Sequence, residues 1–127
     1  MASPDQTLPN QSAPKQFVLK DFELQCGIVL PELSLIYQTY GTLNASRSNV
    51  VLYPTSYGAQ HTDVDWLVRP GGILDPTDWF VIMPNMFGNG LSTSPSNCEA
   101  AKAKGFYFTH FDNVRSQHAL LKSLGID

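Results

Sequence analysis

The residues best suited to bind a metal or move a proton are grouped in His61-Thr62-Asp63-Val64-Asp65. Structural metal sites take imidazole and carboxylate ligands from fixed positions, and this run lies on no regular predicted element. We therefore interpret it as a solvated loop and expect no metal. His110 and His118 lie near or on a predicted helix, where a packed or exposed helix residue is favoured over a catalytic base.

Two other patterns could suggest chemistry. Gly88-Asn89-Gly90 follows a strand-like segment, but phosphate binding needs a fuller glycine-rich turn that opens a helix. We expect this loop to shape an active-site entrance instead. Cys26 and Cys98 lie far apart in the sequence and have no metal-ligand spacing, so we expect two thiols in a reducing compartment.

The strands that would position these residues are of two kinds. Segments 17–24 and 33–40 are rich in β-formers and predict a hairpin, with Gly27 and Pro31 in its turn region. Segments 49–53 and 79–83 are short apolar runs, each followed by a proline. Such runs are typical of strands covered on both faces, as in a parallel sheet.

A short helix is expected within 63–68, and residues 84–108 form a long irregular excursion of the kind that often carries function. The clearest helix follows. Thr109 and Asp112 have capping-box spacing, and Gly125 stands where a helix ends. The apolar residues that recur at helical spacing, and that we expect to face the sheet, are Phe111, Val114, Leu121 and Leu124.

Composition limits the partners. The net charge is −3, and no cluster of Lys and Arg predicts binding to nucleic acid. No run approaches the roughly 18 apolar residues of a membrane span, and residues 1–16 lack the apolar core of a signal peptide. We expect a flexible leader at 1–16, one partial α/β domain at 17–127, no membrane partner, and a cytoplasmic location.

Several segments, in order and sensibly spaced, resemble the homoserine O-acetyltransferase family of the α/β-hydrolase superfamily. The resemblance covers roughly residues 17–127 and rests on segments 35–44, 50–58, 70–76, 79–85, 88–96 and 112–126. It implies an α/β-hydrolase fold with an antiparallel hairpin, parallel strands and flanking helices. It also implies a Ser-His-Asp triad that moves an acyl group from acyl-CoA, as co-substrate, to a small molecule through an acyl-serine.

The same resemblance places the triad beyond Asp127, because no Gly-x-Ser-x-Gly elbow occurs in the 127 residues. The chain would then be the N-terminal part of such an enzyme, cut before the nucleophile strand and inactive by itself. The one catalytic group implied here is the backbone N–H of Ser56, an oxyanion-hole donor after the third strand, with Tyr57 and Gly58 shaping the acyl pocket. An ordinary turn is the alternative for these residues.

The family's usual His-Ala-Leu-Thr-Gly loop reads Pro-Thr-Ser-Tyr-Gly in this sequence. Homoserine as the acceptor is therefore left open. The alternatives are a divergent α/β-fold esterase or hydrolase and a non-catalytic truncated product. No cofactor is expected, and a homodimer of the complete protein stays open.

Overall fold

The computed structural model describes residues 13–127. In chain order its elements are β1 (Lys15–Glu23), β2 (Val29–Tyr40), β3 (Val50–Leu52), α1 (His61–Val64), the 3₁₀ helix η2 (Asp65–Leu67), β4 (Phe80–Pro84), the 3₁₀ helix η3 (Glu99–Lys102) and α2 (His110–Ser123). The first strand begins two residues inside the predicted leader. Residues 1–12 of that leader lie outside the described residues.

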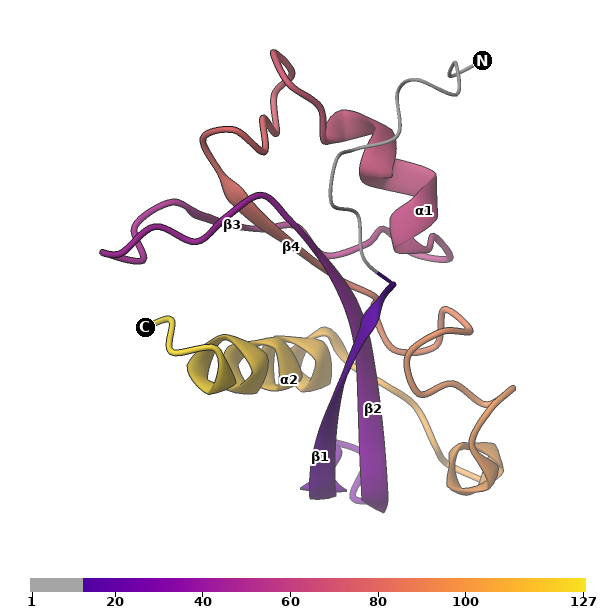
Figure 1. Ribbon diagram of the computed structural model, residues 1–127. Helices are drawn as coiled ribbons and strands as arrows, with labels where there is room; N and C mark the ends of the chain where they lie inside the picture. Colours follow the sequence, from indigo (N-terminus) through magenta and orange to yellow (C-terminus); the bar gives the residue numbers. More distant parts are fainter. Residues whose placement is uncertain (1–12) are drawn as a thin grey trace.

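The four strands form one mixed sheet in the order β1-β2-β4-β3 (Figure 1). The hairpin of β1 and β2 is antiparallel, and β2 also pairs antiparallel with β4. The predicted parallel pairing is confirmed, with Val51 opposite Val81 in β3 and β4. The α/β-hydrolase type of sheet expected from the sequence is therefore present.

The turn of the hairpin is shorter than the sequence predicts, because Pro31 lies within β2. The register passes from the Lys20–Glu32 pair to the Phe22–Leu30 pair and skips Pro31. Proline has no N–H for a ladder hydrogen bond, so a strand tolerates it at such an unpaired position.

Both faces of the inner strand β4 are buried, as its continuous apolar sequence predicts. Ile82 packs in a cluster with Leu120 of α2, and Leu35 of β2 belongs to the same cluster. On the opposite face, Val81 and Met83 pack with residues around α1 and η2. The alternation of side chains along a strand thus sends each neighbour in β4 to a different layer.

The capping box that begins α2 is confirmed. The Thr109 hydroxyl accepts from the Asp112 N–H at 3.1 Å, and the Asp112 carboxylate accepts from the Thr109 N–H at 3.0 Å. The expected apolar stripe is partly wrong, because Phe111 and Val114 are exposed. The buried residues of the helix are Asp112, Asn113, Ser116, Gln117 and Leu120.

Hydrogen bonds to distant loops explain this polar buried face. Asp112 accepts from the Gln25 N–H at 3.0 Å, and Asn113 accepts from the Phe87 N–H at 2.9 Å. Side chains that satisfy loop backbone must point inward, so part of the apolar stripe is turned toward solvent. Leu121 and Leu124, which are half-buried, pack against the core as expected.

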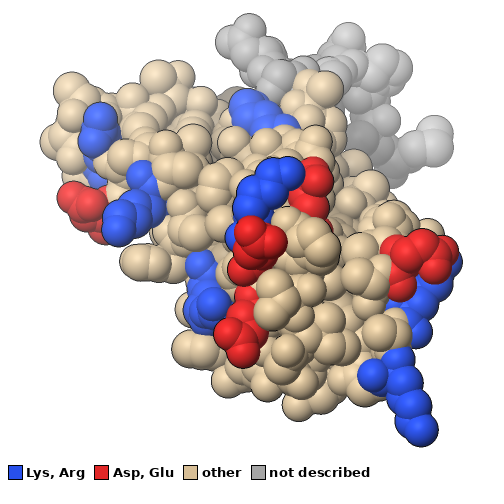
Figure 2. Space-filling view, turned by 90° about the horizontal axis from the view of Figure 1, so that it is seen from below, with Lys and Arg blue, Asp and Glu red and all other residues tan. Residues whose placement is uncertain are grey.

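Within residues 13–127, no helix has the length and apolar character needed to cross a bilayer. The face shown in Figure 2 carries acidic and basic side chains scattered among uncharged ones, with no extended patch of one sign.

The β3 strand pairs with β4 alone among the described strands, so its other side is an open sheet edge. Asn49 accepts from the Phe80 N–H and Tyr53 donates to the Ile82 carbonyl, so the odd-numbered positions face β4. In a parallel pair the intervening residues, Val50 and Leu52, turn their N–H groups toward the edge. Such an edge, apolar and without charge, favours pairing with another chain.

We predict that the purified chain self-associates as its concentration rises, which light scattering would measure. Val50→Pro should reduce the association, because it removes one edge-facing N–H and keeps the ladder to β4. The matched change Val51→Pro removes a ladder donor and should instead lower the melting temperature. Equal association by the wild type and Val50→Pro would contradict pairing through this edge.

Candidate active-site loop

The loop of interest, residues 54–60, follows β3 and lies at the carboxyl ends of the parallel strands β3 and β4. Binding sites of open α/β sheets are found at this end. Its beginning is fixed by buried Thr55. The Thr55 N–H donates to the Pro84 carbonyl at 3.2 Å, and the Thr55 hydroxyl accepts from the Met86 N–H at 3.0 Å. The first residues of the loop therefore keep a fixed position beside the end of β4.

The tip of the loop contains the three residues singled out from the sequence. Ser56, Tyr57 and Gly58 are all exposed, and the Ser56 carbonyl accepts from the Ala59 N–H at 3.0 Å in a tight turn. Gly58 has a φ of +74°, a conformation that side chains disfavour. Among the hydrogen bonds of residues 13–127, none uses the Ser56 N–H. That donor is available to a ligand.

The end of the loop corrects one prediction. The run from His61 to Asp65 is not a solvated loop, because it begins α1 and continues into η2, and His61 is only 3% exposed. The His61 N–H donates at 2.9 Å to the side-chain oxygen of Asn85, which is itself fully buried. A buried hydrogen-bond partner directly after β4 thus fixes the start of α1.

Asn85 is the functional residue that sequence reasoning missed. Its side chain contacts His61, the Ile36 carbonyl and Asn89, which joins α1, β2 and the loop after β4. The available signal was an asparagine directly after a buried apolar strand, at the carboxyl end of a parallel pair.

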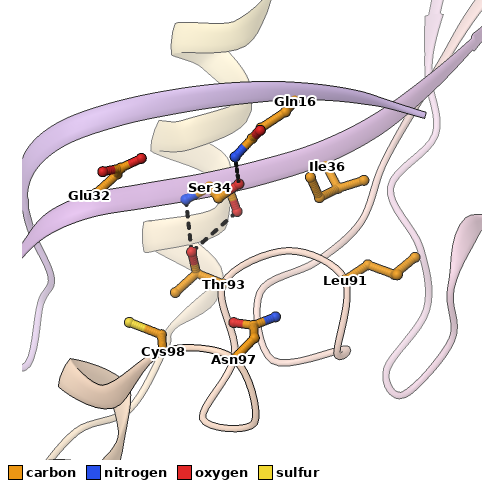
Figure 3. Close-up of a pocket in the computed structure, with 8 residues that line it drawn as sticks. All are labelled: Gln16, Glu32, Ser34, Ile36, Leu91, Thr93, Asn97 and Cys98. Carbon is orange, nitrogen blue, oxygen red and sulfur yellow. Dashed lines mark hydrogen bonds between the residues drawn. The ribbon is translucent and has the colours of Figure 1, made fainter. Parts of the chain in front are cut away.

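The excursion after β4 is ordered by its own side chains. Ser92 donates to the Asn85 carbonyl at 2.7 Å, and the Asn97 carbonyl oxygen accepts from the Ser94 N–H at 2.8 Å. One side of this excursion borders a pocket of about 370 Å³ against β1 and β2 (Figure 3). The pocket is lined by Gln16, Glu32, Ser34, Ile36, Leu91, Thr93, Asn97 and Cys98.

Hydrogen bonds tie the walls of this pocket together. Ser34 accepts from Gln16 at 2.7 Å, and the Ser34 N–H donates to the Thr93 hydroxyl at 2.8 Å (Figure 3). None of the lining residues comes from the loop at 54–60, so this pocket is separate from the Ser56 donor.

The electrostatics of the surrounding layer are quiet. Burial raises the pKa of Tyr40, and the negative charge of Asp65 raises it further, so this phenol stays neutral. Hydrogen bonds from the backbone of Gly71 and Thr77 lower the pKa of Asp75. Within residues 13–127, no three His, Cys, Asp or Glu residues gather as a metal site would require. His110 and His118 are exposed on or beside α2.

The comparisons with known proteins agree with this sheet and loop. No family model matches the sequence. The chain is 38% identical over 101 residues to an ethyl acetate hydrolase of Pseudomonas veronii, an alignment that covers 77% of this chain and 29% of that protein. It is 34% identical over 126 residues to a homoserine O-acetyltransferase of Geobacter sulfurreducens, with 84% and 34% covered.

Among solved structures, the acetyl esterase MekB matches with a TM-score of 0.83 at 34% identity, covering 92% of this chain and 35% of that one. The fold and site therefore define the chain as part of an α/β-hydrolase. Within that superfamily it is related to the homoserine O-acetyltransferases and to acetyl esterases, which confirms the resemblance found in the sequence. The chain spans about a third of the length of these relatives.

We predict that Thr55→Val lowers the free energy of unfolding by about 1–3 kcal/mol, because the Met86 N–H loses its acceptor without a change in side-chain size. The matched control is Thr62→Val, at an exposed position of α1, which should change it by less than about 0.5 kcal/mol. Urea unfolding of both variants measures the difference. Equal losses would mean that the Thr55 hydroxyl does not hold the loop.

Proposed function

We propose that this chain carries the oxyanion-binding part of an acyl-transfer enzyme that works through an acyl-serine. The Ser56 N–H would donate to the oxygen of the tetrahedral intermediate, and Tyr57 and Gly58 would shape the acyl pocket. The observation that carries the proposal is the exposed tip of the loop, where the Ser56 N–H has no partner among residues 13–127. A donor held ready for a developing negative charge stabilises the transition state more than the ground state.

The proposed activity of the complete enzyme is transfer of an acyl group from acyl-CoA to the hydroxyl of a small molecule. The likeness to homoserine O-acetyltransferases supports it. In that reaction the serine oxygen attacks the thioester carbonyl, the CoA thiol leaves, and the acceptor hydroxyl then releases the serine as a new ester forms. The oxyanion donor serves both attacks.

Ester hydrolysis is the second candidate, and it differs only in the last step, where water attacks the acyl-serine in place of the acceptor hydroxyl. The likeness to an ethyl acetate hydrolase and to an acetyl esterase favours it. The Pro-Thr-Ser-Tyr-Gly loop, which departs from the His-Ala-Leu-Thr-Gly of the transferases, points the same way. Both reactions use the same Ser56 donor.

The 127 residues contain no Gly-x-Ser-x-Gly elbow, so we predict that this chain alone has neither activity. Release of p-nitrophenol from p-nitrophenyl acetate and release of thiol from acetyl-CoA are the two assays. Turnover above buffer that survives repurification, and that disappears when a serine of this chain is changed, would contradict the prediction.

The donor itself is tested where this loop and a serine nucleophile belong to one protein. Ser56→Ala keeps the backbone N–H and should be almost silent. Ser56→Pro removes that N–H and should lower kcat by about 10²–10³, the usual effect of losing one oxyanion donor. Equal and mild effects of the two substitutions would reject the assignment and leave the turn as ordinary structure.

A further inference from the structure

The second half of the oxyanion loop is attached to the excursion after β4 by two hydrogen bonds of opposite direction. The side-chain amide of Asn89 donates to the Ala59 carbonyl at 3.0 Å, and the side-chain amide of Gln60 donates to the Asn89 carbonyl at 3.2 Å. Paired bonds of this kind fix both the separation and the orientation of the two segments, which a single bond would not do.

The two ends of the Asn89 side chain have different partners. Its carbonyl oxygen accepts from the N–H groups of Leu91 at 3.0 Å and Ser92 at 3.4 Å, which closes the turn of its own loop. Its NH₂ group donates to the Ala59 carbonyl and, at 3.0 Å, to the side-chain oxygen of Asn85. The donor half therefore faces the oxyanion loop, and the acceptor half does not.

These contacts leave only the tip of the loop free to move. Thr55 fixes the first side through Met86, and Asn89 fixes the second side at Ala59. Because the Ala59 N–H donates to the Ser56 carbonyl, the peptide group at the end of Ser56 is oriented by the residue that Asn89 holds.

We propose that Asn89 is a positioning residue for the Ser56 N–H, and that its NH₂ group keeps this donor in one orientation before substrate binds. The proposal rests on the oxyanion role given to Ser56 above. Asn89 touches no reacting atom in it. A donor that needs no reorganisation at the moment of reaction is the form of electrostatic stabilisation that enzymes use most effectively.

The substitution Asn89→Asp isolates this role, because a carboxylate keeps the two acceptor contacts to Leu91 and Ser92 and loses both donor contacts. The matched control is Asn97→Asp on the same excursion. Asn97 also accepts from a backbone N–H, of Ser94, and donates to carbonyls of its own loop, and no contact joins it to residues 54–60.

The readout is hydrogen–deuterium exchange of the full 127-residue chain, followed by mass spectrometry at micromolar concentration, where edge pairing is weak. In Asn89→Asp, peptides covering 55–61 should exchange about tenfold faster, as expected for the loss of one ordinary hydrogen bond. Peptides from β4 and α2 should keep their rates, and so should every peptide of Asn97→Asp.

A pH series separates positioning from a general loss of structure. Below the pKa of the introduced carboxyl, its O–H becomes a donor, so the ratio of variant to wild-type exchange in 55–61 should fall back toward one. A second variant, Gln60→Met, removes the opposing bond to the Asn89 carbonyl and should accelerate the same peptides by about threefold.

Unchanged exchange in 55–61 for Asn89→Asp, or faster exchange spread equally over all peptides, would overturn the positioning role. Equal acceleration by Asn97→Asp would overturn it too. No acyl substrate takes part in this experiment. Failure of the proposed acyl chemistry would therefore appear in the kinetic test of Ser56→Pro and would leave the exchange result standing.

Discussion

The hydrogen bonds of the buried Asn85 side chain hold together the carboxyl end of this sheet. Its oxygen accepts from the His61 N–H and from Asn89, while its NH₂ group donates to the Ile36 carbonyl at 2.9 Å and lies 3.1 Å from the His61 ring nitrogen. All four hydrogen-bonding positions of the amide are used. An aspartate could not make the two donations, and a leucine would leave buried partners unsatisfied, which is costly inside a protein.

The irregular backbone around the site depends on this one amide. Loops 54–60 and 84–98 run without regular structure, yet their carbonyl and N–H groups are largely paired by asparagine, serine and threonine side chains, which replace a ladder or helix. Buried loops need such partners because no water reaches them. A turn whose two sides are held this firmly can present one backbone N–H, that of Ser56, without a partner inside the described chain.

Much of the fold follows from local sequence patterns. Continuous apolar runs predicted strands covered on both faces, and the capping-box spacing of Thr109 and Asp112 predicted the start of α2. Both signals reflect contacts that act within a few residues or on one layer. The loop at 54–60 was also placed correctly, at the end of a parallel strand.

The errors have a common physical cause. The burial of His61 and the inward polar face of α2 depend on hydrogen bonds between residues 24 to 87 positions apart, such as His61 with Asn85 and Asp112 with Gln25. Hydrophobic periodicity detects which faces avoid water, and it contains no information about polar side chains that are buried to satisfy a distant backbone. Exposed Phe111 and buried Asp112 are the two sides of that limit.

The state of the Asn85 amide protons tests this organisation most directly. In a nuclear magnetic resonance spectrum of the chain, the two side-chain protons of Asn85 should be resolved, exchange slowly with solvent, and show a scalar coupling across the hydrogen bond to the Ile36 carbonyl carbon. Exposed asparagines such as Asn97 should show fast exchange and no such coupling. Fast exchange of the Asn85 protons, with no coupling to Ile36, would show that the amide does not hold the strand end and the oxyanion loop together.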